Sequence, residues 1–139
     1  MKNFSFLFVF ILLLLLSVSR ISFSAPTDKE NDSLRIKIVD VKIDTVQYQP
    51  LLQKGETVSM RSGRIILKKG ENVGEHSTDN YEEFLIILVG QGITIGPDGN
   101  KFPLSEGQII YIPPYYTHNI FNEASEKLIY IYVVSKICE

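Results

Sequence analysis

Short apolar runs separated by turn residues fill the chain from residue 34 onward. The most apolar run is residues 83–89, EFLIILV, in which both alternating sets of positions are apolar, so both faces of this segment should be covered. No segment in this part of the chain has a helical period over a helix-length span. Many short strands with frequent turns predict an all-β fold, either an antiparallel barrel or a sandwich.

The same pattern predicts where individual strands lie. Residues 34–43, LRIKIVDVKI, alternate apolar and charged positions, but the apolar set changes parity near Ile38, which indicates a bulge or a break. Residues 45–56 read as a connection, and PDGN at residues 97–100 is typical of a hairpin turn. Further strands are expected at residues 57–62, 63–70, 83–89, 92–95, 101–104, 108–112, 117–122 and 126–135.

The start of the chain has the layout of a secretory signal peptide. A lysine near the start is followed by an unbroken apolar run at residues 6–16 and then by small residues. We expect residues 1–24 to be removed by cleavage after Ser24, with Ala25 as the second choice. The alternative is a retained membrane anchor, but the run is short against the ~20 apolar residues of a spanning helix. The sequence therefore predicts a secreted or periplasmic protein with no stable membrane span after processing.

The rest of the chain predicts a polar lead-in and one domain. Residues 25–33 are polar and charged and are expected to be disordered, whereas residues 34–139 suit one domain with a single core. The formal net charge is −2 and the sequence has no basic cluster, so it lacks the positive charge that nucleic-acid binding requires. Cys138 is the only cysteine, so there is no internal disulfide framework and no cysteine-based zinc site. It is interpreted as a terminal free thiol or as half of an intermolecular disulfide.

Candidate chemistry gathers around the two histidines of the chain, and the first lies in a regularly spaced segment. Gly70 is followed by five residues and then by His76, and Thr78 comes two positions later. Four residues separate Thr78 from Glu83, and six separate Glu83 from Gly90. If this segment is a strand, His76 and Thr78 point to the same side, because side chains alternate between faces.

The second histidine lies in a similar segment. Gly107 is followed by five residues and by Pro113, and Tyr115 comes two positions later. Two further residues lead to His118, and three more lead to Asn122. Two glycine-bounded segments of this kind, in this order, are a specific combination.

Together the two segments resemble the paired motifs of the cupin superfamily, and they cover residues 70–122. Every spacing of the family pattern is met, but Thr78 stands where the first motif has a second histidine, and Tyr115 stands where the second has a glycine. The resemblance implies a double-stranded β-helix, or jelly-roll barrel, at residues 34–139, with roughly eight to ten strands. Because cupins often dimerise, it also implies a possible homodimer.

The resemblance further implies a metal site, with His76, Glu83 and His118 as ligands and Thr78 at the fourth position. Independently of the family, Glu83 shares its parity with Leu85 and should face the interior, where an uncompensated carboxylate costs several kcal/mol. A divalent cation is one remedy. Two imidazoles and a carboxylate would accept Fe, Mn, Ni or Zn.

Several alternatives stay open at the sequence level. Thr78 is a poor ligand, so the site is either an open catalytic metal, a weak metal site or a metal-free cavity that binds its ligand through hydrogen bonds. Glu82 is interpreted as a solvated rim charge, because the count to Gly90 favours Glu83 as the inward carboxylate. Tyr116 shares the parity of His118, and Thr78 shares that of His76. Thr78 and Tyr116 are therefore the candidate substrate-binding residues.

Two functions follow from this reading. The first is a metal-dependent enzyme, of oxidoreductase or isomerase type, that acts on a small organic molecule such as a sugar derivative or a small acid. The second is a non-enzymatic cupin module that binds a small ligand or a metal. The sequence identifies no catalytic residue, and fold-level resemblance does not choose between these functions.

Overall fold

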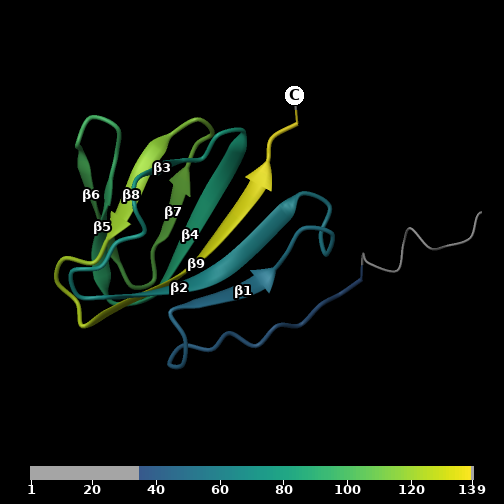
Figure 1. The fold of residues 1–139 in the computed structure, drawn as a ribbon, viewed down its shortest axis with the longest axis horizontal. Coiled ribbons are helices and arrows are strands. Elements are labelled where there is room, and N and C mark those ends of the chain that lie inside the picture. Colours follow the sequence, from purple (N-terminus) through teal and green to yellow (C-terminus); the bar gives the residue numbers. More distant parts are fainter. Residues whose placement is uncertain (1–34, 139) are drawn as a thin grey trace, which may run out of the picture. The chain divides into compact units, whose positions relative to one another are not determined.

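The computed structural model describes residues 35–138, which form nine strands and no helix (Figure 1). The all-β class predicted from the sequence is confirmed. The expected signal peptide at residues 1–24 and lead-in at residues 25–33 lie outside the described residues. In the described part, no helix is long and apolar enough to cross a membrane. The strands are β1 Tyr48–Leu52, β2 Met60–Lys68, β3 His76–Ser77, β4 Tyr81–Val89, β5 Gln91–Ile95, β6 Lys101–Ser105, β7 Ile109–Ile112, β8 Thr117–Phe121 and β9 Lys127–Lys136.

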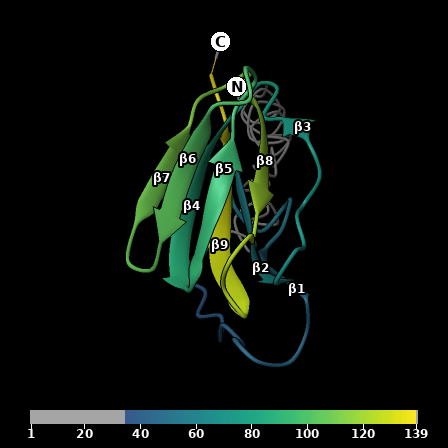
Figure 2. The ribbon, with the colours of Figure 1, turned by 90° about the vertical axis from the view of Figure 1, so that its left-hand side faces the viewer.

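The strands form two antiparallel sheets that face each other (Figure 2). One sheet has five strands in the order β1-β2-β9-β4-β7, and the other has four in the order β3-β8-β5-β6. From β4 to β9 the chain passes back and forth between the sheets, because β4, β7 and β9 belong to the first and β5, β6 and β8 to the second. This path is that of a jelly roll, which confirms the expected double-stranded β-helix.

The apolar core lies between the two sheets, and β4 illustrates how the sequence builds it. Leu85 and Ile87 are buried in the core, and Glu83, which shares their parity, is buried on the same side. The opposite face of β4 is only partly covered within residues 35–138, since Phe84 is exposed and Ile86 is half-buried. The homodimer that would cover this face stays a prediction. The buried core cluster comprises Leu67, Leu85, Ile87, Leu104, Ile112, Ile120, Leu128 and Tyr130.

The strand predicted at residues 34–43 is wrong, because residues 35–47 contain no strand. The alternation of apolar and charged residues is real, but in the described chain no neighbouring strand pairs with it. Ile36 and Ile38 are consequently 95% and 92% exposed.

The first strand forms instead at Tyr48–Leu52, inside the segment expected to be a connection. This strand, β1, pairs antiparallel with the outer edge of β2. The buried side chain of Arg64 on β2 donates hydrogen bonds from Nη1 to the carbonyl oxygens of Val46 and Gln47. These bonds hold the chain immediately before β1 against β2.

A second difference concerns Gly63, where two short strands were expected to meet. The structure has a single strand through this position, β2, and Gly63 pairs with Tyr132 of β9. A Cβ at Gly63 would lie 2.8 Å from ring atoms of both Tyr132 and Tyr48. The glycine therefore provides space for two aromatic rings rather than a turn.

Gly90, which follows β4, combines two demands that only glycine meets. Its φ is +85°, in the left-handed region, and a Cβ would overlap the carbonyl oxygen of Lys127. Gly99, in the hairpin turn between β5 and β6, also has a positive φ of +73°, but no atom lies within 4 Å of a Cβ there.

These two glycines give a matched test of the packing at Gly90. Gly99→Ala should lower the free energy of unfolding by about 1–2 kcal/mol, the cost of a left-handed conformation for an L-residue. Gly90→Ala should lower it by a further amount of about 1–3 kcal/mol, because the backbone of Lys127 must also move. Urea denaturation of both variants measures the difference. Equal losses would show that the approach of Lys127 to Gly90 is not a tight contact.

Candidate functional site

The three residues expected to bind a metal converge between the two sheets. His76 of β3 and His118 of β8 are direct partners in the register of the four-stranded sheet, and their ring centroids lie 4.4 Å apart. Glu83 reaches them from β4 of the opposite sheet, with its Oε2 3.4 Å from Nε2 of His118. One donor atom from each of the three side chains lies within 4.8 Å of the others.

Both imidazole rings are oriented by backbone carbonyls. Nδ1 of His76 lies 2.9 Å from the carbonyl oxygen of Gly74, and Nδ1 of His118 lies 3.3 Å from that of Tyr116. A carbonyl oxygen only accepts hydrogen bonds, so each Nδ1 carries a proton and donates it. In the neutral form of the ring, Nε2 then carries the lone pair. Metal-binding histidines are commonly held by such a second hydrogen bond.

The contact between His118 and Glu83 is the main electrostatic feature of this cluster. His118 is 1% exposed and Glu83 is 7% exposed, and Nε2 of His118 has no hydrogen-bond partner in the described chain. A lone pair and a carboxylate oxygen that face each other in a buried place repel unless a cation lies between them. That cation is either a proton, which would make an imidazolium–carboxylate pair, or a metal ion.

The donor set is compatible with a divalent metal. Imidazole and carboxylate ligands bind such ions at about 2.0–2.2 Å, so two donors on one ion are at most about 4.4 Å apart. The donor atoms here all lie within 4.8 Å of one another, which is close to this limit. Glu82, the neighbouring carboxylate, is not in the cluster and instead accepts a 3.4 Å hydrogen bond from the hydroxyl of Tyr111. The choice of Glu83 as the inward carboxylate agrees with this arrangement.

Thr78 lines the same cavity, but its hydroxyl is already used. Strand β3 ends at Ser77, and the buried Oγ1 of Thr78 donates to the carbonyl oxygen of Pro113 at 2.8 Å. The same atom accepts a 2.9 Å hydrogen bond from the backbone N–H of Tyr116. Thr78 therefore fastens the end of β3 to the loop that leads into β8, and its role in substrate binding stays a prediction.

The other expected binding residue, Tyr116, is not among the residues that line the cavity. It packs against the apolar core, and its hydroxyl lies against Gly96, where a Cβ would come within 2.7 Å. Its neighbour Tyr115 occupies the position of the motif glycine and has a φ of 58°. The backbone conformation that the family pattern meets with glycine is thus kept here by a tyrosine, whose N–H donates to the carbonyl oxygen of Asp79 at 2.7 Å.

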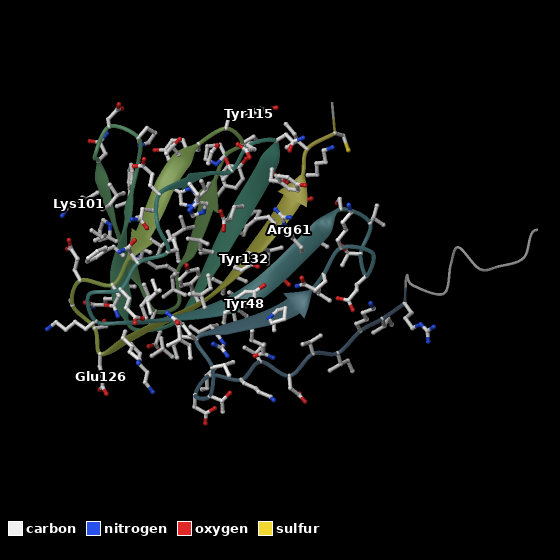
Figure 3. The ribbon with its side chains drawn as sticks, in the orientation of Figure 1. Tyr48, Arg61, Lys101, Tyr115, Glu126 and Tyr132 are labelled. Carbon is white, nitrogen blue, oxygen red and sulfur yellow. The ribbon has the colours of Figure 1, made fainter. Side chains whose placement is uncertain are left out.

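The cavity around the cluster has a volume of about 510 Å³. Besides the predicted site residues, it is lined by residues that the sequence analysis did not identify. Tyr48 of β1, Arg61 of β2, and Tyr130 and Tyr132 of β9 form much of its wall. Figure 3 labels Tyr48, Arg61 and Tyr132. None of these four residues lies in the motif segments at residues 70–122. The only local signal was their alternation with outward-facing positions along the strands.

Two of these tyrosines form a hydroxyl pair. The hydroxyl oxygens of Tyr48 and Tyr132 lie 3.2 Å apart. Burial raises the pKa of Tyr132 above its usual value, and the hydrogen bond with Tyr48 raises it further, whereas the positive charge of Arg61 lowers it. Burial likewise raises the pKa of Tyr130. The phenols of Tyr130 and Tyr132 therefore stay neutral near pH 7, so their hydroxyl groups can act as hydrogen-bond donors.

The structural role of Thr78 can be tested by removing its hydroxyl. Thr78→Val should lower the free energy of unfolding by about 1–3 kcal/mol, because the N–H of Tyr116 would lose its buried acceptor. Thr78→Ser keeps the oxygen and should lose clearly less. Thermal and urea denaturation measure both variants. A valine variant as stable as the serine variant would show that the hydroxyl does not hold the loop.

Comparison with known proteins places this arrangement in a family. The family profile described as "Cupin domain" matches residues 52–134. A protein described as "Polyketide synthase CurC" from Streptomyces cyaneus is 28% identical, and the match covers 76% of this chain and 73% of that protein.

Solved structures agree with the profile. An RmlC-like cupin family protein with a double-stranded β-helix fold, from Methanocaldococcus jannaschii, is 25% identical with a TM-score of 0.63, covering 73% of this chain and 91% of the other. A predicted oxalate decarboxylase from Thermotoga maritima shares the fold, with a TM-score of 0.60 at 24% identity, covering 65% of this chain and 79% of the other. Because the profile match spans more than half of the sequence and the fold agrees with it, this chain belongs to the cupin family.

Proposed function

We propose that this protein is a small metal-dependent enzyme that acts on a small organic molecule in its barrel cavity. The observation that carries the proposal is the buried contact between His118 and Glu83, with His76 close by. Two acceptors in a buried place need a cation, and two imidazoles with one carboxylate are a donor set that Fe, Mn, Ni and Zn accept. The curated relative, which is described as a polyketide synthase, supports an enzymatic role for a domain of this kind.

The residues of the cavity have distinct tasks in this proposal. His76, Glu83 and His118 would hold the metal, which would supply Lewis-acid or O₂-binding chemistry. The Tyr48–Tyr132 hydroxyl pair would orient the substrate by hydrogen bonds, since both groups line the same cavity as the cluster.

A metal-free binding module is the second candidate function, and a specific observation favours it. Thr78 stands at the fourth ligand position, and its hydroxyl is committed to Pro113 and Tyr116. His118 and Glu83 are also close enough, at 3.4 Å, to form an ion pair directly if the imidazole carries a second proton. In this case the cavity would bind its ligand through hydrogen bonds alone.

Metal content distinguishes the two functions. The purified protein should contain about one Fe, Mn, Ni or Zn per chain by elemental analysis after dialysis. Glu83→Gln and His118→Ala should each weaken metal binding by more than the roughly 10- to 100-fold that follows loss of a residue that merely orients a ligand. Glu82→Gln is the matched control, because it removes the adjacent carboxylate outside the cluster and should keep the metal.

The opposite result would favour the binding module. Protein that takes up no metal after incubation with each of these ions, yet melts at a higher temperature with a small ligand, would contradict the enzyme proposal.

We also propose that the protein is exported to the periplasm or the medium and that residues 1–24 are removed. The supporting feature is the apolar run at residues 6–16, followed by small residues. Expression of the full chain in a secreting host should yield a product whose intact mass corresponds to a start at Ala25, or at Pro26 for the second cleavage choice. Full-length protein in the membrane fraction would support the retained anchor instead.

A further inference from the structure

Arg61 is an exposed cation that lines the cavity and has no ionic partner among residues 35–138. It lies on β2 and lines the same cavity as the His–Glu–His cluster. Within residues 35–138, no carboxylate forms an ion pair with it and no hydrogen bond holds it. Its described contact is with Tyr81, whose ring lies 4.7 Å from the centre of the guanidinium group.

The contact with Tyr81 leaves the binding capacity of Arg61 unused. The cation–π contact uses the charge of the guanidinium group, and within residues 35–138 none of its N–H donors forms a hydrogen bond with another residue. These donors form a planar fork that matches the two oxygens of a carboxylate. Arg61 therefore lines the cavity, and its described contact is with the ring of Tyr81.

Tyr48 and Tyr132 line the same cavity as Arg61. Tyr48 and Tyr132 lie over Gly63, where a side chain would collide with both rings. Their hydroxyl groups are 3.2 Å apart, and one donates to the other, so one hydrogen of the pair remains available to a ligand. Ile65 and Val134 add apolar surface to the same cavity. Figure 3 shows Arg61, Tyr132 and Tyr48 following one another over the β1–β2–β9 region, with Lys101 on the other side of the barrel.

Charge decides which ligand fits this wall. The cavity lining carries one fixed cation, Arg61, and one carboxylate, Glu83. A divalent ion on the His–Glu–His cluster would neutralise Glu83 and leave the cavity positive. A neutral sugar would leave the donors of Arg61 without an anionic partner, whereas a carboxylic acid would satisfy them.

We propose that the cavity recognises a small carboxylic acid with a planar, aromatic or unsaturated body. Arg61 binds the carboxylate through its donor fork, and the rings of Tyr48 and Tyr132 flank the body of the ligand. The far end of the ligand reaches the His76–Glu83–His118 cluster, and in that part the inference rests on the proposed function. The volume of about 510 Å³ suits a ligand of this size.

The test compares acids with their neutral analogues by isothermal titration calorimetry. The probes are benzoate, phenylacetate and cinnamate, each measured beside its primary amide, which has nearly the same shape without the charge. At least one acid should bind the unmodified protein about tenfold more tightly than its amide, the scale of a charge-assisted hydrogen bond at a partly exposed site.

Variants of Arg61 locate this preference. Arg61→Gln should weaken the acid about tenfold and leave the amide unchanged. Arg61→Lys keeps the charge but loses the planar fork, so its affinity for the acid should be intermediate. Lys101→Gln is the matched control, because Lys101 lies outside this cavity in an exposed pair with Glu123, and its loss should change neither affinity. Circular dichroism verifies that each variant is folded.

The outcomes separate this inference from the proposed function. Each titration is repeated after metal removal by a chelator. If the metal-free protein prefers the acid and Arg61→Gln removes that preference, the inference is supported. If the protein also takes up no metal, the enzyme proposal is contradicted while the inference stands. The inference is overturned if no acid binds more tightly than its amide. It is also overturned if Arg61→Gln lowers the affinity for the acid no more than Lys101→Gln does. That result would overturn the inference whether or not the protein contains metal.

Discussion

The buried carboxylate of Glu83 is the constraint on which the rest of this structure depends. It lies on the same face of β4 as the core residues Leu85 and Ile87. Its Oε2 atom lies 3.4 Å from Nε2 of His118. An uncompensated charge in such a place costs several kcal/mol. The cross-strand pairing of His76 with His118 brings two imidazoles close to this carboxylate, and backbone carbonyls hold the Nδ1 atom of each ring. The surrounding barrel thus concentrates acceptors at one point, which is the arrangement that a cation stabilises.

The parts of this structure that follow from local spacing could be predicted from the sequence. Alternation along residues 83–89 places Glu83 with Leu85 on the inner face, because period two holds wherever the strand is regular. The two motif segments predict, through the resemblance to cupins, that His76 and His118 belong to one site, and the structure pairs them directly across β3 and β8. Tyr115 shows why a departure from the family pattern can be tolerated: it keeps the left-handed conformation, with a φ of 58°, that the glycine would have provided.

Features that depend on distant pairing could not be predicted in this way. The alternation at residues 34–43 looks like a strand, yet the edge of the sheet is taken by β1, which Arg64 anchors through the carbonyl oxygens before it. The wall of the cavity is assembled from β1, β2 and β9, which no local motif connects. Parity places Tyr116 inward with His118, but it does not reveal that the tyrosine hydroxyl ends against Gly96, because that depends on packing with a distant turn.

The location of the His–Glu–His cluster has a mechanical consequence for the fold. Two of its residues belong to the four-stranded sheet and the third to the five-stranded sheet, so an ion held there would act as a clasp between the layers. Strand β3 is only two residues long and would gain most from such a clasp. Ion binding at the cluster would then raise the free energy of unfolding by opposing separation of the two sheets, since an ion that binds only the folded form stabilises it. A change in core packing between the sheets would in turn alter the spacing of the donor atoms and hence the affinity of the site.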